Sequence, residues 1–195
     1  HIYVDLCGNQ LLAITGPSGT GKSTLLNTIA NYMPPLSGHI TLFPSQYPHT
    51  PIAYLPQQPW IKNASLLDNI REFAPDATTA EILACLGSLG LSREFATREN
   101  VLETPLGEHG QGFSGGQMQR VALSRVLLNP TPIILLDEPT AKLDLQSKDI
   151  ILSAIKSLQQ QAIVIVATHD PALMNLADSC INLDSVGEEI HAVLV

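Results

Sequence analysis

Short apolar runs recur along this chain and give its first structural signal. They span four or five residues, are rich in Leu, Ile and Val, and lack the polar side that a half-exposed strand shows. Continuous runs of this length suit strands that are buried on both faces of a parallel sheet. The runs occupy residues 11–15, 133–136 and 163–167, and residues 2–6 look like a further strand.

Helical periodicity replaces these runs in other parts of the chain. Residues 22–32 place Leu25, Leu26 and Ile29 on one face and stop at a Pro-Pro pair, which predicts a helix. Residues 147–160 form an amphipathic helix candidate between the last two apolar runs. Strands and helices therefore alternate, which predicts an α/β fold with a mostly parallel sheet.

The middle of the chain has a different pattern. Two short β-like runs, residues 40–43 and 52–55, are separated by Pro, His and Ser residues. Residues 65–128 are mostly helical, with breaks near positions 75, 87–90 and 105–112. We expect a helical subdomain, at approximately residues 58–130, to be inserted into the core that contains the sheet.

Composition places the chain among globular proteins. It has 195 residues, 45% of them hydrophobic and 14% charged, which is enough for one domain with a proper core and a small subdomain. The net charge of −8 disfavours non-specific binding to nucleic acid, which needs clustered Lys and Arg. The cysteines, Cys7, Cys85 and Cys180, share no metal or redox spacing and indicate a reducing compartment.

The first residues and the length of the apolar runs indicate what kind of chain this sequence comes from. No run approaches the roughly 18 apolar residues of a membrane span. No signal peptide is visible and the first residue is not Met. We therefore expect a fragment of a longer protein that is soluble when isolated.

A glycine-rich motif of the form G-x-x-x-x-G-K-[ST] lies between the first apolar run and the first helix. Its glycines let backbone N–H groups surround a phosphate, and the helix that begins there adds its dipole. Lys22 is expected to bridge the β- and γ-phosphates, and the Ser23 hydroxyl is expected to bind Mg²⁺. The motif predicts that the chain binds a nucleoside triphosphate with Mg²⁺. The predicted nucleotide-binding residues are Gly16, Pro17, Ser18, Gly19, Thr20, Gly21, Lys22, Ser23 and Thr24.

Two acids follow the apolar run at 133–136. The carboxyl ends of parallel strands are where α/β folds bind their ligands. Asp137 is expected to hold the Mg²⁺ shell, and Glu138 to orient or deprotonate the attacking water.

A third motif, Phe-Ser-Gly-Gly-Gln at residues 113–117, precedes a helical stretch that continues to Arg125. Ser114 is expected to cap a helix whose free N–H groups face outward as a second anion site. The motif resembles the signature of the ABC ATPase family, usually Leu-Ser-Gly-Gly-Gln, with Phe113 in place of Leu. The order of phosphate loop, signature and acidic strand is also that of the family, and the resemblance covers nearly the whole chain. The signature residues are Ser114, Gly115, Gly116 and Gln117.

The resemblance extends to three single residues. Gln57, rather than its neighbour Gln58, lies where the family has the glutamine that senses Mg²⁺ and the γ-phosphate. Asp144 matches the D-loop aspartate, although Lys142 replaces a small residue there. His169 matches the switch histidine, which in the family contacts the γ-phosphate and helps to hold the water and the catalytic acid. Glu138, His169 and Gln57 are thus the implied catalytic residues, and Ser23, Gln57 and Asp137 the implied Mg²⁺ ligands.

The resemblance also implies the architecture. It predicts a P-loop NTPase core with a mostly parallel sheet, a small antiparallel β-subdomain and an inserted helical signature subdomain. The stretch between Lys22 and Gln57 is shorter than usual in the family, so the β-subdomain is expected to be shortened. The family stacks adenine on an aromatic residue well upstream of the phosphate loop. Tyr3 is too close to Gly16 for that role, so this platform is expected to be missing from the fragment.

Two segments resemble the exporter type of the family. Residues 102–110 resemble a T-x-x-G-E-x-G segment that lies near the membrane subunit's intracellular helices, and residues 59–70 are likewise exporter-like. Trp60 belongs either to the core or to the groove for a coupling helix. Residues 103–130 look most like the thiol (cysteine/glutathione) exporters of cytochrome bd assembly. In exporters the ATPase domain follows a membrane domain, so we expect residues 1–195 to be one ABC ATPase domain of a longer transporter chain.

The implied mechanism is a head-to-tail pair of domains that sandwiches ATP and Mg²⁺ between the phosphate loop of one domain and the signature of the other. ATP binding closes the pair, and hydrolysis lets it open and drives transport. The implied partners are a membrane-spanning domain and a second ATPase domain in a homo- or heterodimer, with no nucleic acid. The implied location is the cytoplasmic face of the membrane, which is the inner membrane in a bacterium.

Other functions compete with this interpretation. One is a soluble ABC ATPase of DNA repair or translation. Repair types insert long coiled coils, whereas here Lys22 and Ser114 are about 90 residues apart without sustained heptads, and translation types carry two such domains in tandem. A P-loop kinase would need neither the signature nor His169. A module that binds ATP without hydrolysing it is disfavoured by the presence of Glu138 and His169.

Overall fold

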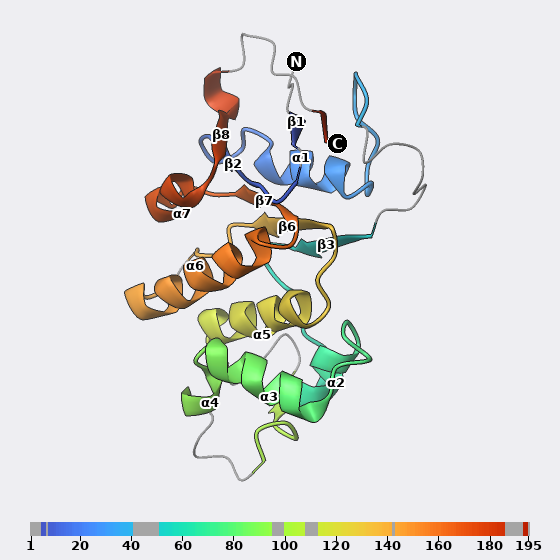
Figure 1. Cartoon of the computed structure of the whole chain (residues 1–195), viewed down its shortest axis with the longest axis vertical. Helices are drawn as coiled ribbons and strands as arrows, with labels where there is room; N and C mark the ends of the chain where they lie inside the picture. Colours follow the sequence, from blue (N-terminus) through green and yellow to red (C-terminus); the bar gives the residue numbers. More distant parts are fainter. Residues whose placement is uncertain are drawn as a thin grey trace. The chain divides into compact units, whose positions relative to one another are not determined.

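A five-stranded sheet forms the centre of the first of two units in the computed structural model (Figure 1). The core unit comprises His1–Tyr54, Thr131–Glu138 and Lys156–Val195, and the helical unit comprises Leu55–Pro130 and Pro139–Ile155. The structure describes residues 5–6, 8–40, 51–94, 100–107, 113–141, 143–185 and 193–194.

The sheet has the strand order β3-β6-β7-β2-β8. Its neighbouring pairs β6–β7, β7–β2 and β2–β8 are parallel. The apolar runs of the sequence become its central strands, whose residues are buried because the sheet is covered on both faces. The strands are β3 (Ile52–Leu55), β6 (Ile133–Asp137), β7 (Ile163–Ala167), β2 (Leu11–Thr15) and β8 (Ser179–Asn182).

Alternate residues of the central strands build one side of the hydrophobic core. Helix α1 (Lys22–Ile29) covers this side with Leu26 and Ile29 and contacts β6 and β7. Helix α7 (Pro171–Leu176) contacts β2. The short strands β1 (Asp5–Leu6) and β9 (Val193–Leu194) pair in parallel, and the 3₁₀ turn η2 (Leu183–Ser185) follows β8. The strand side chains of this core are Leu6, Leu12, Ile14, Ile133, Leu135, Ile163, Ile165, Ala167 and Ile181.

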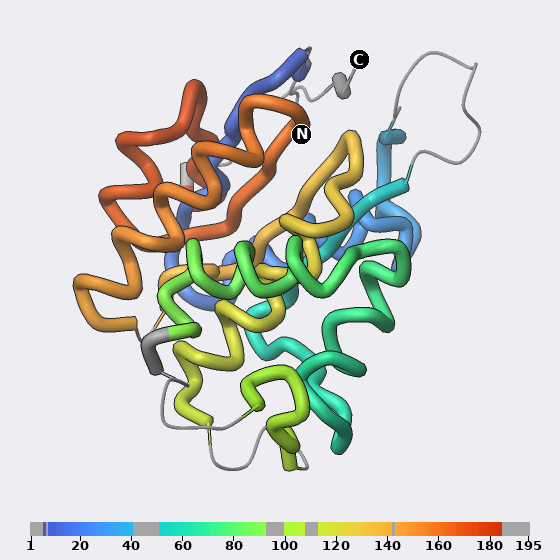
Figure 2. The backbone as a smooth tube through the Cα atoms, turned by 60° about the horizontal axis from the view of Figure 1, so that its bottom comes forward, coloured from blue at the N-terminus to red at the C-terminus, as the bar shows by residue number. Residues whose placement is uncertain are grey.

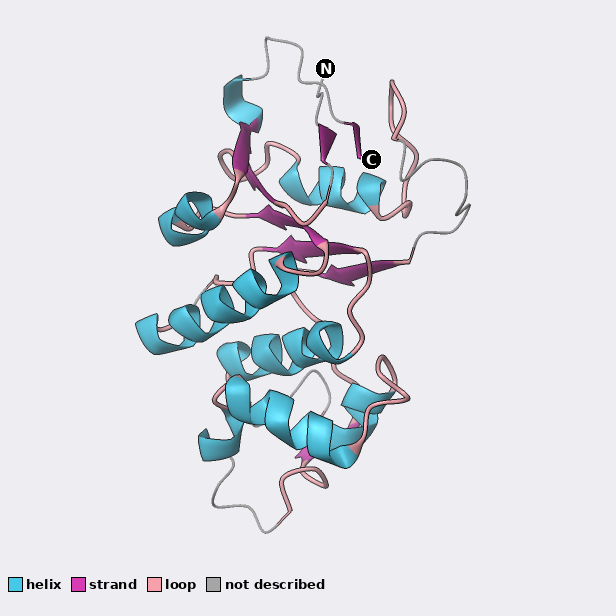
Figure 3. Ribbon diagram, viewed as in Figure 1, coloured by secondary structure: helices cyan, strands magenta, loops and turns pink. Residues whose placement is uncertain are grey.

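In its described residues the helical unit contains four complete helices, most of a fifth and a two-stranded ribbon (Figure 3). Helix α5 contacts both α2 and α3, and α3 contacts α4; the backbone trace shows α3 running beside α5 (Figure 2). The elements that lie entirely in the helical unit are β4 (Ala64–Ser65), α2 (Leu66–Arg71), α3 (Thr79–Ser88), α4 (Leu91–Glu94), β5 (Pro105–Leu106) and α5 (Gly115–Leu128). Strands β4 and β5 are antiparallel. Helix α6 (Leu145–Gln159) begins in this unit, and its last residues are assigned to the core unit.

The α/β fold with a mostly parallel sheet is confirmed, with differences at element ends. The first helix ends at Ile29, earlier than the predicted residue 32, because Asn31 adopts a left-handed backbone with φ 61° that cannot continue a helix. The predicted run at 52–55 is β3, the edge strand of the sheet. The other predicted run, residues 40–43, lies outside the described residues beyond position 40, and so does most of the predicted strand at 2–6.

Candidate active site

The ends of three neighbouring strands bring the predicted site residues of the core unit together. In the register of the sheet, Ala167 pairs with Ile14 on one side and with Asp137 on the other. All three strands are parallel, so the residues that follow them emerge at one edge. The phosphate loop follows β2, Glu138 follows β6 and His169 follows β7.

The phosphate loop has a backbone that requires glycine at its start. Gly16 adopts φ 137°, and an added Cβ would lie 2.9 Å from Thr20 Oγ1. Thr20 is fixed there because both its N–H and its hydroxyl donate to the carbonyl oxygen of Pro17. The loop leads into α1 through Gly21, where no side chain caps the helix and no acid lies in the first turn. The N-terminal N–H groups of α1 thus have the chemistry of an anion site.

Lys22 provides a positive charge at this edge of the sheet, and the residue is buried, with 7% of its surface exposed. Its ammonium donates to the carbonyl oxygens of Gly16 (2.7 Å) and Pro17 (3.1 Å). It also lies 2.9 Å from His169 Nε2. Lys22 therefore spans from the phosphate loop to the end of β7, across the place where the motif predicts phosphates.

Glu138 is held in an unusual backbone conformation beside His169. Its φ is 49°, a left-handed value that is uncommon outside glycine, while its N–H donates to Ala167 O at 2.9 Å. The N–H of His169 donates to Glu138 Oε2 at 3.3 Å. Burial raises the pKa of the Glu138 carboxyl, and the nearby His169 and Lys22 oppose this shift. A carboxylate whose proton affinity is raised in this way is suited to accept a proton from water.

His169 has two competing partners at one ring nitrogen. The ammonium of Lys22 can only donate, so the 2.9 Å contact requires His169 Nε2 to be an acceptor, which means a neutral ring. The same Nε2 lies 3.3 Å from Glu138 Oε1, a contact that requires an N–H on Nε2. One nitrogen cannot satisfy both at once, and the side chain is 47% exposed. His169 is thus placed to exchange partners between the lysine and the acid.

Asp137 ends β6 with a buried carboxylate. The residue is 3% exposed, and its Oδ1 has no hydrogen-bond partner among the described residues. A buried carboxylate oxygen without a partner is costly unless something else binds it. Burial, followed by the proximity of Asp137, raises the pKa of Tyr54 to about 12. A hard cation such as Mg²⁺ prefers oxygen ligands of this kind, so the orphaned Oδ1 fits the predicted metal shell.

The signature residues begin α5 in the helical unit. Ser114 caps the helix by accepting from the Gln117 N–H at 3.1 Å, and Ser114 N–H donates to Gln117 Oε1 at 2.8 Å. This reciprocal capping box confirms the predicted cap and fixes both side chains. At Gly116 an added Cβ would lie 2.9 Å from Leu143 Cδ2, so the end of that half-buried side chain would have to shift.

Asp144 is the N-terminal cap of α6. Its two carboxylate oxygens accept from the N–H (2.9 Å) and the hydroxyl (2.8 Å) of Ser147. These hydrogen bonds lower the pKa of Asp144. The D-loop aspartate therefore has a structural partner in its own helix. Its neighbour Lys142 lies outside the described residues.

The remaining predicted features lie in the helical unit. Gln57 and Gln58 are both exposed in the loop after β3. Trp60 is 53% exposed, so it is not a core residue. Thr104 and Leu106 are buried in the exporter-like segment, of which residues 108–110 lie outside the description.

Sequence reasoning missed two features. Tyr54 was read only as part of a strand, although it lies beside Asp137 in the folded chain. The buried pair Asn69 and Arg125 was also missed. A polar Asn between the apolar Leu66 and Ile70 was a usable signal, because a buried amide normally binds backbone groups.

The parallel sheet, the glycine-rich loop leading into α1 and the acids at the strand end define an α/β nucleotide-binding fold of the P-loop type. Residues 1–141 match the ABC transporter family, and the chain belongs to that family.

The chain is similar to a transport protein named for ATP-binding and permease parts, to a lipid flippase and to an ABC exporter of known structure. It is 35% identical over 190 residues to the glutathione/L-cysteine transport system ATP-binding/permease protein CydC of Bacillus subtilis, covering 94% of this chain and 34% of that protein. It is 33% identical over 192 residues to the ATP-dependent lipid A-core flippase of Vibrio vulnificus, covering 94% of this chain and 33% of the flippase. A solved structure of a bacterial Atm1-family ABC exporter with ATP bound superposes with a TM-score of 0.80 and 28% identity, covering 90% of this chain and 32% of the exporter.

The chain thus spans about a third of the length of the curated relatives it matches. Among the helices in the described part of the chain, none has the length and apolar character needed to cross a membrane. The competing prediction of a DNA-repair or translation ATPase is not favoured by these relatives.

Proposed function

We propose that this chain is the ATP-binding and ATP-hydrolysing domain of an ABC exporter. The observation that carries the proposal is the shared edge of the sheet, where the phosphate loop with Lys22, the acids after β6 and His169 after β7 lie next to one another. ATP binding is a property of the family to which the chain belongs. The proposal adds that this chain hydrolyses ATP, that it uses Mg²⁺ and that it works with partner domains.

Each residue at this edge has a proposed task. The phosphate loop, residues 16–24, binds the triphosphate through backbone N–H groups, and Lys22 exchanges its contacts with loop carbonyls and His169 for phosphate oxygens. Ser23, Asp137 and Gln57 are the proposed Mg²⁺ ligands. Bound Mg²⁺ would supply neutralisation of the charge on the phosphate oxygens.

Hydrolysis requires a positioned water and a proton acceptor. Glu138 is the proposed acceptor, since its burial raises its proton affinity and its backbone is fixed by the sheet. His169 leaves Lys22 when the phosphates take over the ammonium, and it then faces the γ-phosphate and Glu138. The partner exchange at Nε2 thereby links nucleotide binding to the formation of the catalytic arrangement.

The complete site is proposed to need a second domain. The signature residues Ser114 to Gln117 of one copy would contact the ATP held by the phosphate loop of another, with Asp144 near the shared boundary. We infer that residues 1–195 are one ABC ATPase domain with a helical subdomain at about 58–130, joined to a membrane-spanning domain. Its place would be the cytoplasmic face of a membrane. The similarity to a transport protein named for both ATP-binding and permease parts supports this organisation.

The similar proteins support a particular transported substrate less directly than they support transport itself. The similarity to a protein named for glutathione and cysteine transport supports the predicted thiol exporter. Lipid A-core flippases have a similar identity of 33%. The thiol substrate therefore stays a prediction, whereas the exporter type is also supported by the solved structure of an ABC exporter.

Loss of the Lys22 ammonium tests the phosphate loop. Lys22→Ala should weaken ATP binding by about one to two orders of magnitude, the usual worth of charge-assisted hydrogen bonds. Isothermal titration of ATP with Mg²⁺ measures this change. Lys156→Ala, at an exposed lysine in the last turn of α6, is the matched control and should bind like the parent chain. Equal ATP affinity in Lys22→Ala and the parent would refute the assignment.

A further inference from the structure

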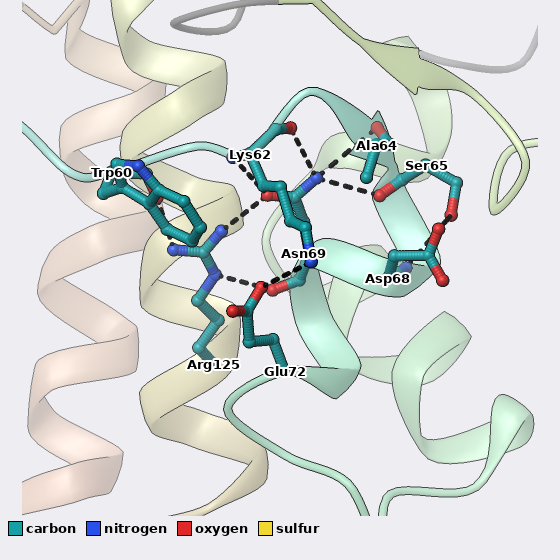
Figure 4. Close-up of polar contacts among 8 residues, drawn as sticks. All are labelled: Trp60, Lys62, Ala64, Ser65, Asp68, Asn69, Glu72 and Arg125. Atoms are coloured by element: carbon teal, nitrogen blue, oxygen red, sulfur yellow. Dashed lines mark hydrogen bonds and ion pairs between the residues drawn. The ribbon is translucent and has the colours of Figure 1, made fainter.

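The loop that presents Trp60 has no regular structure of its own. Residues 59–63, here called the Trp60 loop, connect the region after β3 to β4 and α2. Their backbone polar groups cannot pair within a helix or sheet, so other groups must satisfy them. In this structure, two buried side chains bind the Trp60 carbonyl oxygen and both backbone groups of Lys62 (Figure 4).

Asn69 is the first of the two, and it is fully buried on α2. Its Oδ1 accepts from the Lys62 N–H at 2.8 Å, and its Nδ2 donates to the carbonyl oxygens of Lys62 (3.0 Å) and Ser65 (2.9 Å). The side-chain amide of Asn69 thus hydrogen-bonds both the N–H and the carbonyl oxygen of Lys62, as Figure 4 shows. The end of the Trp60 loop is fixed to α2 by this side chain.

Arg125 is the second, and it comes from the last turn of α5. Its guanidinium donates through Nε to Asn69 O (3.0 Å), through one terminal nitrogen to Trp60 O (2.8 Å) and through the other to Asn69 Oδ1 (3.1 Å). The Phe73 ring lies 4.6 Å from the guanidinium carbon, a cation–π contact. The planar fork of arginine is needed for this set, because its nitrogens reach acceptors on two different segments.

Burying the charged guanidinium of Arg125 costs free energy, so its contribution to stability alone does not explain its presence. The residue is 7% exposed, and the three acceptors named above are neutral. Burial lowers the pKa of Arg125 to about 10, and the charge of Glu72 opposes the shift, so the group stays cationic at neutral pH. A buried cation generally stabilises a fold no more than apolar side chains of the same size would. What it does specify is where the Trp60 backbone lies relative to α5.

Helix α5 connects this cluster to the signature. It begins with Gly115 after the Ser114 cap, and Arg125 lies about 15 Å along the helix from that start at 1.5 Å per residue. Residues 119–126 of α5 are buried, so the helix is packed along most of that length. A displacement of one end of such a helix is transmitted to the other end, because a packed helix moves as a rigid element.

We propose that Arg125, together with Asn69, is a positioning residue that couples nucleotide contact at the signature to the place of the Trp60 loop. The inference rests on the proposed function, since the signature meets nucleotide only in that account. Trp60 is 53% exposed, and Phe73, which stacks on the same guanidinium, is 45% exposed. The loop that moves therefore carries an exposed aromatic side chain.

Trp60 is itself the reporter, because it is the only tryptophan of the chain. In a Glu138→Gln background, which keeps ATP bound, we expect ATP with Mg²⁺ to change the emission maximum and the acrylamide quenching of Trp60. Arg125→Lys keeps the charge but cannot reach all three acceptors. It should bind ATP with unchanged affinity and lose the fluorescence response.

Arg71→Lys is the matched control, because Arg71 is an exposed arginine in the last turn of α2. It should keep the full response. A merely structural Arg125 would lower the melting temperature of Arg125→Lys but leave the ATP response in place, and that result would overturn the proposal. A Trp60 signal that does not respond to bound ATP in the Glu138→Gln chain would overturn it too.

A second measurement avoids any change at Arg125. Hydrogen exchange in the Glu138→Gln chain should show that ATP alters the protection of the amides of residues 60–65, among them the Lys62 N–H bonded to Asn69. Bound ATP with unchanged exchange there contradicts the coupling and leaves the proposed function intact. Absence of ATP binding, measured by titration on the same sample, contradicts the proposed function itself and the coupling with it.

Discussion

At the scale of single residues, the site is a set of groups held ready by contacts that nucleotide would replace. Lys22 donates to carbonyl oxygens of its own loop, which are weaker partners than phosphate oxygens. Asp137 keeps a buried carboxylate oxygen without a partner in the described part of the chain. Glu138 keeps a strained backbone. Local costs of this kind are typical of functional sites.

Thiol reactivity tests the burial of a residue outside the site. Burial raises the pKa of Cys85 from 9.0 to about 11. Only the thiolate reacts, so below pH 9 alkylation should be about 100-fold slower than for an ordinary thiol and should rise until about pH 11. Iodoacetamide labelling of a Cys7→Ser, Cys180→Ser chain measures this rate as a function of pH.

The comparison chain for this experiment carries Cys7→Ser and Cys85→Ser and leaves the exposed Cys180. Cys180 should label rapidly near pH 8. A Cys85 rate that levels off near pH 9, as an ordinary thiol does, would show that the burial is absent in solution.

At the scale of elements, helix ends carry much of the proposed function. Helix α1 begins without a side-chain cap at the phosphate loop, whereas α5 and α6 begin with the Ser114 and Asp144 caps. An uncapped N-terminus leaves its N–H groups for an anion. A capped one fixes the angle at which the chain enters the helix, which for α5 sets the direction of the signature.

The two signature glycines should respond differently to substitution. An added Cβ at Gly115 meets nothing within 4 Å, whereas at Gly116 it lies 2.9 Å from Leu143 Cδ2. Gly115→Ala should therefore be neutral or stabilising by up to about 1 kcal/mol. Gly116→Ala should be less favourable than Gly115→Ala, because the end of the half-buried Leu143 side chain must shift to make room. Thermal unfolding followed by circular dichroism ranks the two against the parent, and equal melting temperatures would contradict the packing of Leu143 on Gly116.

Local pattern was enough to predict the strands and the phosphate loop. The runs at 133–136 and 163–167 became β6 and β7 because continuous burial leaves few alternatives for such short segments. The end of α1 was predicted too late, because the prediction rests on the Pro-Pro pair, although Asn31 was an earlier signal for a left-handed helix end. The partners of Lys22 could not be predicted, since they depend on which strand lies beside β2. The same holds for Asn69 and Arg125, which meet across 56 residues of sequence.

At the scale of the whole molecule, the chain corresponds to about a third of its relatives. The described residues hold a phosphate loop in one unit and a signature in the other. In the proposed account each ATP is shared by two copies, so a single chain offers two half-sites. In the proposed coupling, nucleotide contact at the signature would reach the Trp60 loop through α5.

The most direct test of this account is the rate of phosphate release by Glu138→Gln at saturating ATP and Mg²⁺, compared with the parent chain. Removing a general base should lower the rate by about 10²–10⁴-fold while ATP affinity is retained. Glu103→Gln, at an exposed acid, is the control and should hydrolyse ATP at the parental rate. Steady hydrolysis by Glu138→Gln at the parental rate would contradict the account.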